Sequence, residues 1–127
     1  MSFSTTTLAN PTATKLHTGT PTSGGGTAVE DQISASATAL AQVHIDNSNN
    51  ASATVYVKLW NKIASNVTVG TTAPDLIFPC PGGTTLTYAF PQETSFGTAC
   101  SISAVTTGGT GGTASMTNSI TVYLLQG

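Results

Sequence analysis

The sequence predicts an all-β fold, an antiparallel β-sandwich of jelly-roll or Greek-key type with an extended N-terminal arm. After residue 36, several short stretches alternate apolar and polar residues, which is the period of a half-buried strand. Gly, Pro and Asn separate these stretches, and no segment has the period of an amphipathic helix. The chain of 127 residues has the length of one domain. We therefore predict an arm over residues 1–36 and one sandwich domain over residues 37–127.

The arm is rich in Thr, Ser, Gly and Ala and lacks a sustained apolar period. A segment with so little apolar surface does not offset its own ordering entropy. It therefore needs support, which is either an edge of the domain's own sheets or a neighbouring subunit. Of these two supports we favour the neighbouring subunit.

The first predicted strand covers residues 39–45. Val43 and Ile45 alternate with Gln42 and His44, so one face is apolar and the other is polar. The Asp and Asn residues that follow favour a turn, because their side chains bond to nearby backbone amides. This pattern predicts the entry of a hairpin, with His44 facing solvent or a partner.

The clearest strand pattern follows over residues 53–60, where Val55, Val57 and Leu59 share one face. Pro79 has no amide donor, so a strand that contains it is predicted to lie at a sheet edge or to end early. The remaining predicted strands are 76–80, 86–90, 99–105 and 119–125.

The composition argues against a nucleic-acid or membrane partner. Only 6% of the residues are charged, and three lysines are the only basic residues apart from two histidines. Phosphate backbones are bound by clusters of Lys and Arg, which this chain lacks. No apolar run approaches the length of a membrane span. Because a chain with so little charge tends to associate, we expect it to function within an assembly.

No residue pattern predicts an active site, a metal site or a cofactor, and we expect that the chain is not an enzyme. The carboxylates fall in predicted loops or at strand ends, and no spacing pairs two of them. The histidines, His17 and His44, do not form a metal-binding pair. The Gly-rich stretches lack the lysine and helix of phosphate-binding loops. The acidic residues are Glu30, Asp31, Asp46, Asp75 and Glu93.

Cys80 and Cys100 are the only cysteines, too few for a disulfide scaffold. Both lie in apolar strand-like stretches, where a thiol behaves as a small buried apolar group. We favour that interpretation, and a bridge stays open if the two strands are neighbours.

The second face of strand 53–60 carries the candidate interface. Tyr56, Lys58 and Trp60 lie opposite the aliphatic face, and Tyr123 and Leu125 of the last strand are predicted to extend their surface. Large aromatic side chains on such a face need cover. A partner provides it in one interpretation, since aromatics are enriched at interface centres. A second layer of the same chain provides it in the other.

Five segments of the sandwich domain carry a family resemblance. They are YVKLWNK at 56–62, VGTTAP at 69–74, PCPGG at 79–83, FGTACSI at 96–102 and TTG at 106–108. Together they resemble a block found in short β-rich structural proteins of tailed-phage virions. The resemblance covers roughly residues 51–127 and leaves out the arm. It implies a virion component and brings no catalytic residues.

From this resemblance and the low charge we expect a decoration or cement protein of a phage capsid. It would be made in the host cytoplasm and would bind the outer capsid surface, contacting the major capsid protein and copies of itself as a homotrimer. One alternative is a tail or fibre component that contacts the host. Another is a secreted carbohydrate-binding sandwich that stacks sugars on Trp60 and Tyr56.

Overall fold

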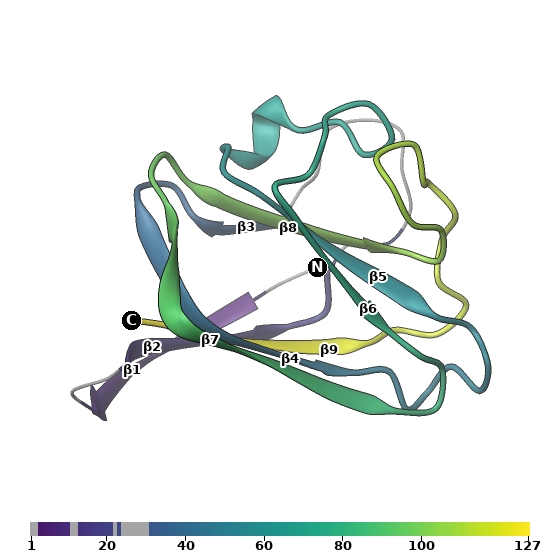
Figure 1. Ribbon diagram of the computed structural model, residues 1–127, viewed down its shortest axis with the longest axis horizontal. Helices are drawn as coiled ribbons and strands as arrows, with labels where there is room; N and C mark the ends of the chain where they lie inside the picture. The colour runs from purple at the N-terminus through teal and green to yellow at the C-terminus, as the bar shows by residue number, and fades with distance from the viewer. Residues whose placement is uncertain (1–2, 11–12, 22, 24–30) are drawn as a thin grey trace.

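A computed structural model describes residues 3–10, 13–21, 23 and 31–127 of the chain. Two antiparallel sheets, one of five strands and one of four, pack face to face (Figure 1). The predicted all-β sandwich is thereby confirmed. The elements are β1 (Phe3–Asn10), β2 (Ala13–Gly19), β3 (Asp31–Ser34), β4 (Thr38–Asp46), β5 (Val55–Trp60), the 3-10 helix η1 (Ala64–Asn66), β6 (Leu76–Cys80), β7 (Thr85–Phe96), β8 (Cys100–Val105) and β9 (Thr121–Gln126).

The strand order is that of a jelly roll, one of the two predicted topologies. The five-stranded sheet has the order β1-β2-β9-β4-β7, and the four-stranded sheet has the order β3-β8-β5-β6. Strands pair from the ends of the chain inward: β2 with β9, β3 with β8, β4 with β7 and β5 with β6. This is a long hairpin of eight strands folded into two sheets. β1 adds one further strand beside β2.

The six strands predicted between residues 39 and 125 are confirmed as β4 to β9. β6 lies at a sheet edge, as Pro79 predicts. β7 is longer than predicted and continues to Phe96, because residues 94–96 pair again with β4 after an irregularity in the register.

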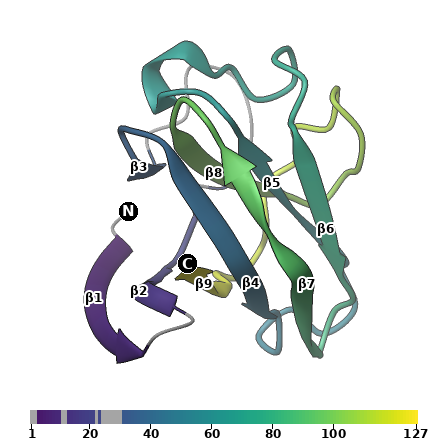
Figure 2. The same ribbon diagram turned by 60° about the vertical axis from the view of Figure 1, so that its left-hand side comes forward.

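The described residues of the arm form three strands that the sequence did not predict. β1 and β2 make a hairpin that pairs with β9, at the side of the five-stranded sheet opposite to β7 (Figure 2). Buried His17 of β2 links β1 to β9, with Nδ1 2.9 Å from Thr5 Oγ1 and Nε2 2.9 Å from Gln126 Oε1. These residues thus lie on the chain's own sheets, the support that we did not favour. Added contacts with neighbouring subunits stay a prediction.

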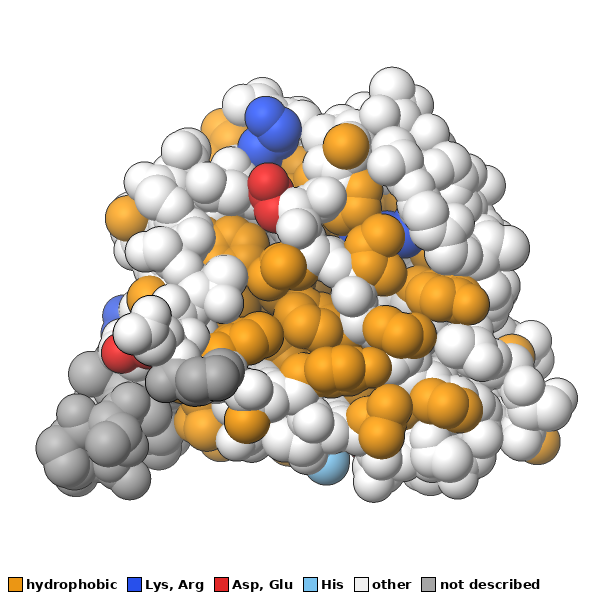
Figure 3. All heavy atoms as spheres, in the orientation of Figure 1, with side chains coloured by type: hydrophobic (Ala, Val, Ile, Leu, Met, Phe, Trp, Pro, Cys, Tyr) orange, Lys and Arg blue, Asp and Glu red, His pale blue; other side chains and the backbone are white. Residues whose placement is uncertain are grey.

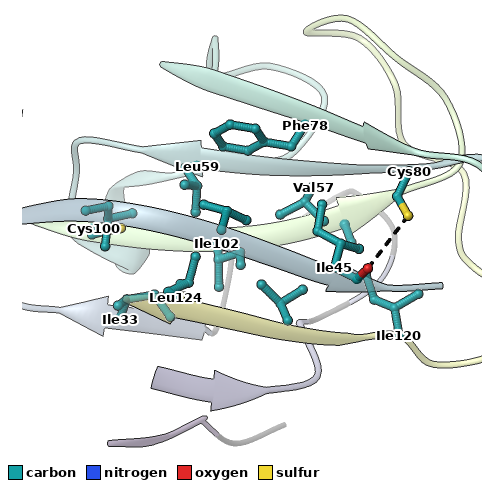
Figure 4. Close-up of a cluster of buried hydrophobic side chains, with 14 of the residues drawn as sticks. Ile33, Ile45, Val57, Leu59, Phe78, Cys80, Cys100, Ile102, Ile120 and Leu124 are labelled. Atoms are coloured by element: carbon teal, nitrogen blue, oxygen red, sulfur yellow. Dashed lines mark hydrogen bonds between the residues drawn. The ribbon is translucent and has the colours of Figure 1, made fainter. Parts of the chain in front are cut away.

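The main core lies between the two sheets. Val57 and Leu59 of β5 point toward the five-stranded sheet, where Ile45 of β4 and Leu124 of β9 belong to the same buried cluster (Figure 4). Full burial of an aliphatic side chain of this size contributes about 1.5–3 kcal/mol. The aliphatic face of β5 is therefore the core face, and its other face points away from the sandwich interior.

Candidate interaction surfaces

The outer face of β5 is covered by the chain's own loops. Trp60 is fully buried with Val67 and Val69, which come from the segment between β5 and β6, and with Val105 of β8. Its Nε1 donates a hydrogen bond to Thr72 O at 3.0 Å. Trp60 is therefore packed internally, the second of the two interpretations that the sequence left open. Because no indole surface is exposed, Trp60 is not available to a partner in this structure.

Lys58 lies on the same face of β5 and is also buried. Its Nζ donates hydrogen bonds to Gly109 O at 2.6 Å and to Gly112 O at 3.1 Å. Burial lowers the pKa of Lys58 below its ordinary value of 10.5, because the charged form loses its hydration. The lysine tethers the Gly-rich loop between β8 and β9 to the sheet. That loop needs a glycine at position 112, since a Cβ there would collide with the carbonyl oxygen of Thr107.

Tyr56 is the member of this face that keeps exposed surface. It is partly buried and packs against the cluster around Trp60. Gly108 lies close to its ring, so that a Cβ on this glycine would be 3.2 Å from Tyr56 Cε2. An interface role for Tyr56 stays a prediction.

Tyr123 and Leu125 do not extend this face, because β9 belongs to the other sheet. They alternate with buried neighbours and therefore point outward from the five-stranded sheet. Tyr123 is 36% exposed, and its ring centre is 5.6 Å from that of His44. His44 Nδ1 in turn lies 2.6 Å from Thr87 Oγ1. The five candidate residues are thus divided between two outer faces.

Two of the described carboxylates have local structural partners, whereas Glu93 of β7 is exposed. Asp46 Oδ1 accepts hydrogen bonds from Ser48 Oγ at 2.6 Å and Ser48 N at 3.0 Å, and these bonds lower the pKa of Asp46. Asp75 Oδ2 accepts a hydrogen bond from Asn61 N at 2.6 Å. Within the described ranges, no three His, Cys, Asp or Glu residues gather into a possible metal site. Glu30 and the side chain of Asp31 lie outside the described residues.

Both cysteines are buried and unbridged, as the favoured interpretation predicts. Cys80 lies on β6 and Cys100 on β8, and β5 separates these two strands. Burial raises the pKa of the Cys100 thiol to about 12.

An asparagine network that the sequence did not reveal joins three loops at one end of the sandwich. Asn47 Nδ2 donates to Ala53 O at 3.0 Å and to Cys80 O at 2.9 Å. Asn50 Nδ2 donates to Asn47 Oδ1 and Asn118 O, both at 2.8 Å. The stretch of Asn residues after β4 was the signal, but it indicated a turn rather than its contacts.

The sandwich is open along the edge between β6 and β7, which the sequence also did not reveal. Apolar side chains gather there between the two sheets (Figure 3). Phe78 of β6 packs against Tyr88 and Phe90 of β7, with ring centres 5.0 and 6.0 Å apart, respectively. The Tyr88 hydroxyl donates a hydrogen bond to Pro79 O. Leu86 at the same edge is 38% exposed.

In the part of the chain that the structure describes, no helix is long and apolar enough to cross a membrane. Comparisons with protein-family models, curated protein sequences and solved structures found no match to this chain.

Proposed function

We propose that this chain is a structural protein of a virus particle, which decorates the outer surface of a phage head and cements it. The observation that carries the proposal is a jelly roll with almost no surface charge and with sheet edges left open. Jelly rolls recur in viral capsid proteins, although also in lectins and cupins. Because one fold serves many functions, the surface and not the fold decides between these classes.

The surface favours neutral protein contacts. Of the three lysines, Lys58 is buried under the Gly-rich loop, and only Lys15 and Lys62 are exposed. Asp46 and Asp75 are engaged in turns next to β4 and β6. What remains for a partner is mainly hydroxyl, amide and apolar surface, which suits a broad contact with a capsid protein.

Cementing follows from mass action. A protein that binds the assembled shell and not its separated subunits lowers the free energy of the shell by RT ln(1 + L/Kd) per site, where L is its free concentration. Copies of this chain bound across adjacent capsid subunits would therefore delay the release of the genome on heating. The homotrimer expected from the sequence stays a prediction, and the cementing effect does not require it.

The test uses purified particles that carry this chain. Quantitative mass spectrometry is expected to find hundreds of copies per particle, and particles that lack the chain are expected to release their genome at a lower temperature. A handful of copies would assign the chain to the tail or a fibre. Equal heat resistance with and without the chain would contradict the cement role.

The carbohydrate-binding alternative loses its main support. A stacking platform built on Trp60 and Tyr56 requires an exposed indole ring, and the ring of Trp60 is buried beneath the loop after β5. Binding of the purified chain to a glycan array would restore this alternative.

A further inference from the structure

We propose that the β7 edges of two copies pair antiparallel about a two-fold axis, so that their five-stranded sheets form one continuous sheet. This self-association goes beyond the proposed capsid function and does not depend on it; it gives a dimer in place of the homotrimer expected from the sequence. In the pairing, residues 85–89 of each copy face each other, with Thr87 opposite Thr87 of the second copy.

The first argument is that this edge is unprotected. Among the described strands, β7 pairs only with β4. Natural proteins usually guard such an edge with charges, prolines or bulges. Residues 85–89 have none of these, and their register with β4 is regular. The guards appear only later, as a register irregularity after Ala89, the proline at position 91 and Glu93.

The second argument is the apolar strip beside this edge. Leu86 is 38% exposed, and Tyr88 and Phe90 are only partly buried where they lie over Phe78. A strand added along β7 would cover this strip, because its side chains on the same face would lie over the open side of the sandwich. The opposite edge of the sheet, β1, instead exposes hydroxyl side chains such as those of Ser4 and Thr6.

The third argument identifies the partner as a second copy. Two identical surfaces meet without repulsion only where they carry no net charge, and residues 76–92 contain no charged residue at all. A two-fold contact needs a self-complementary patch. Directly opposed residues in an antiparallel pair point to the same face. With Thr87 on the axis, Leu86 therefore lies beside Tyr88 of the second copy, so each copy's exposed apolar side chain covers the other's strip.

The mass in solution is the first test. Light scattering of the purified full chain is expected to give twice the chain mass of 12.8 kDa. Leu86→Lys places a positive charge on each copy at the contact, where the two charges repel each other. It is expected to give a folded monomer, with a circular dichroism spectrum like that of the wild type. Thr6→Lys on the β1 edge is the matched control and is expected to remain a dimer.

A cross-link tests the register. Thr87→Cys is expected to form a disulfide-linked dimer in air, since opposed Cα atoms in a sheet lie within the range that a disulfide spans. The native cysteines are buried and do not compete. Thr6→Cys is the control and is expected to stay unlinked.

Three results overturn the inference: a monomer at millimolar concentration, a trimer, or an oligomer that Leu86→Lys leaves intact. A monomer whose β7 amides become protected from hydrogen exchange only when capsid protein is added would identify a different occupant. Failure of the dimer leaves the capsid proposal intact, because copy number and heat resistance are measured on particles.

Discussion

At the scale of single residues, the most unusual group is the buried ammonium of Lys58. Its hydrogen-bond acceptors are the backbone carbonyls of Gly109 and Gly112, so its charge is solvated by peptide dipoles. The alternating pattern of β5 placed this lysine on the outer face correctly. Nothing in the sequence indicated that the Gly-rich loop folds over it. Its role is to fasten that loop.

Replacing Lys58 with Met is expected to release the loop. Two hydrogen bonds to a charged donor contribute about 1.5–3 kcal/mol each, and the relief of burying a charge offsets part of their loss. We expect an unfolding free energy lower by about 1–3 kcal/mol and faster amide hydrogen exchange over residues 106–115. Lys62→Met is the control, since Lys62 is exposed. Unchanged exchange in Lys58→Met would show that the loop holds its position without the lysine.

Cys100 makes the fold sensitive to alkaline pH. Its thiol has a pKa of about 12 in the folded chain and an ordinary value of 9.0. The folded state thus retains a proton that the unfolded state loses. The contribution of this proton to the free energy of unfolding is fully present below pH 9.0 and falls as the pH rises toward about 12. The loss is at most about 4 kcal/mol, from about 1.4 kcal/mol per pH unit.

Urea unfolding at several alkaline pH values checks this prediction. Cys100→Ala is expected to be less stable at neutral pH because of the cavity, but to lose less stability as the pH rises. Lys58 acts in the opposite direction, since its lowered pKa favours the fold as the pH approaches 10.5. Equal slopes in the wild type and Cys100→Ala would contradict the assignment to Cys100.

At the scale of elements, the loops at one end of the sandwich are fixed by side-chain amides. The side chain of Asn47 connects the β4–β5 loop to the end of β6, because its Nδ2 donates hydrogen bonds to the carbonyls of Ala53 and Cys80. The sequence indicated a turn here because Asp and Asn suit turns. It gave no sign that Asn118, far along the chain, completes the network.

Asn47→Asp is expected to destabilise the chain strongly. The carboxylate has no hydrogens to donate, so the carbonyls of Ala53 and Cys80 lose their partner and face a buried negative charge. We expect a loss of about 2–5 kcal/mol in urea unfolding. Asn49→Asp is the control, because Asn49 is exposed and its substitution adds the same negative charge. A similar loss in both variants would attribute the effect to charge alone.

At the scale of the whole molecule, the alternating pattern predicted the strands but not their partners. The period of two reflects burial of one face, which each strand satisfies locally, whereas pairing depends on residues far apart in the sequence. β1 escaped prediction because Thr and Ser make up half of it, and β2 because Leu16 is its only large aliphatic residue. The pairing of β1 with β2 and of β2 with β9 supplies the support that composition does not. For the same reason, Tyr123 was placed with Trp60 although their strands lie in different sheets.

If the chain decorates a capsid as proposed, its binding there is expected to depend little on salt. Raising NaCl from about 0.1 M to about 1 M shortens the screening length from about 10 Å to about 3 Å. With so few exposed charges, the dissociation constant should change by less than about three-fold, and sulfate should tighten binding by favouring burial. Sedimentation of shells with labelled chain measures this. A steep loss of binding in NaCl would indicate ionic contacts.

The position of β9 has a consequence for how the chain is made. β9 lies between β2 and β4, and its Gln126 contacts His17 across 109 positions of sequence. A ribosome must therefore translate through this strand before the larger sheet can close, and such long-range closure is slow. Until then the facing edges of β2 and β4 lack their partner strand. Overproduction at high temperature should thus favour inclusion bodies, and slower synthesis in the cold should favour the native protein.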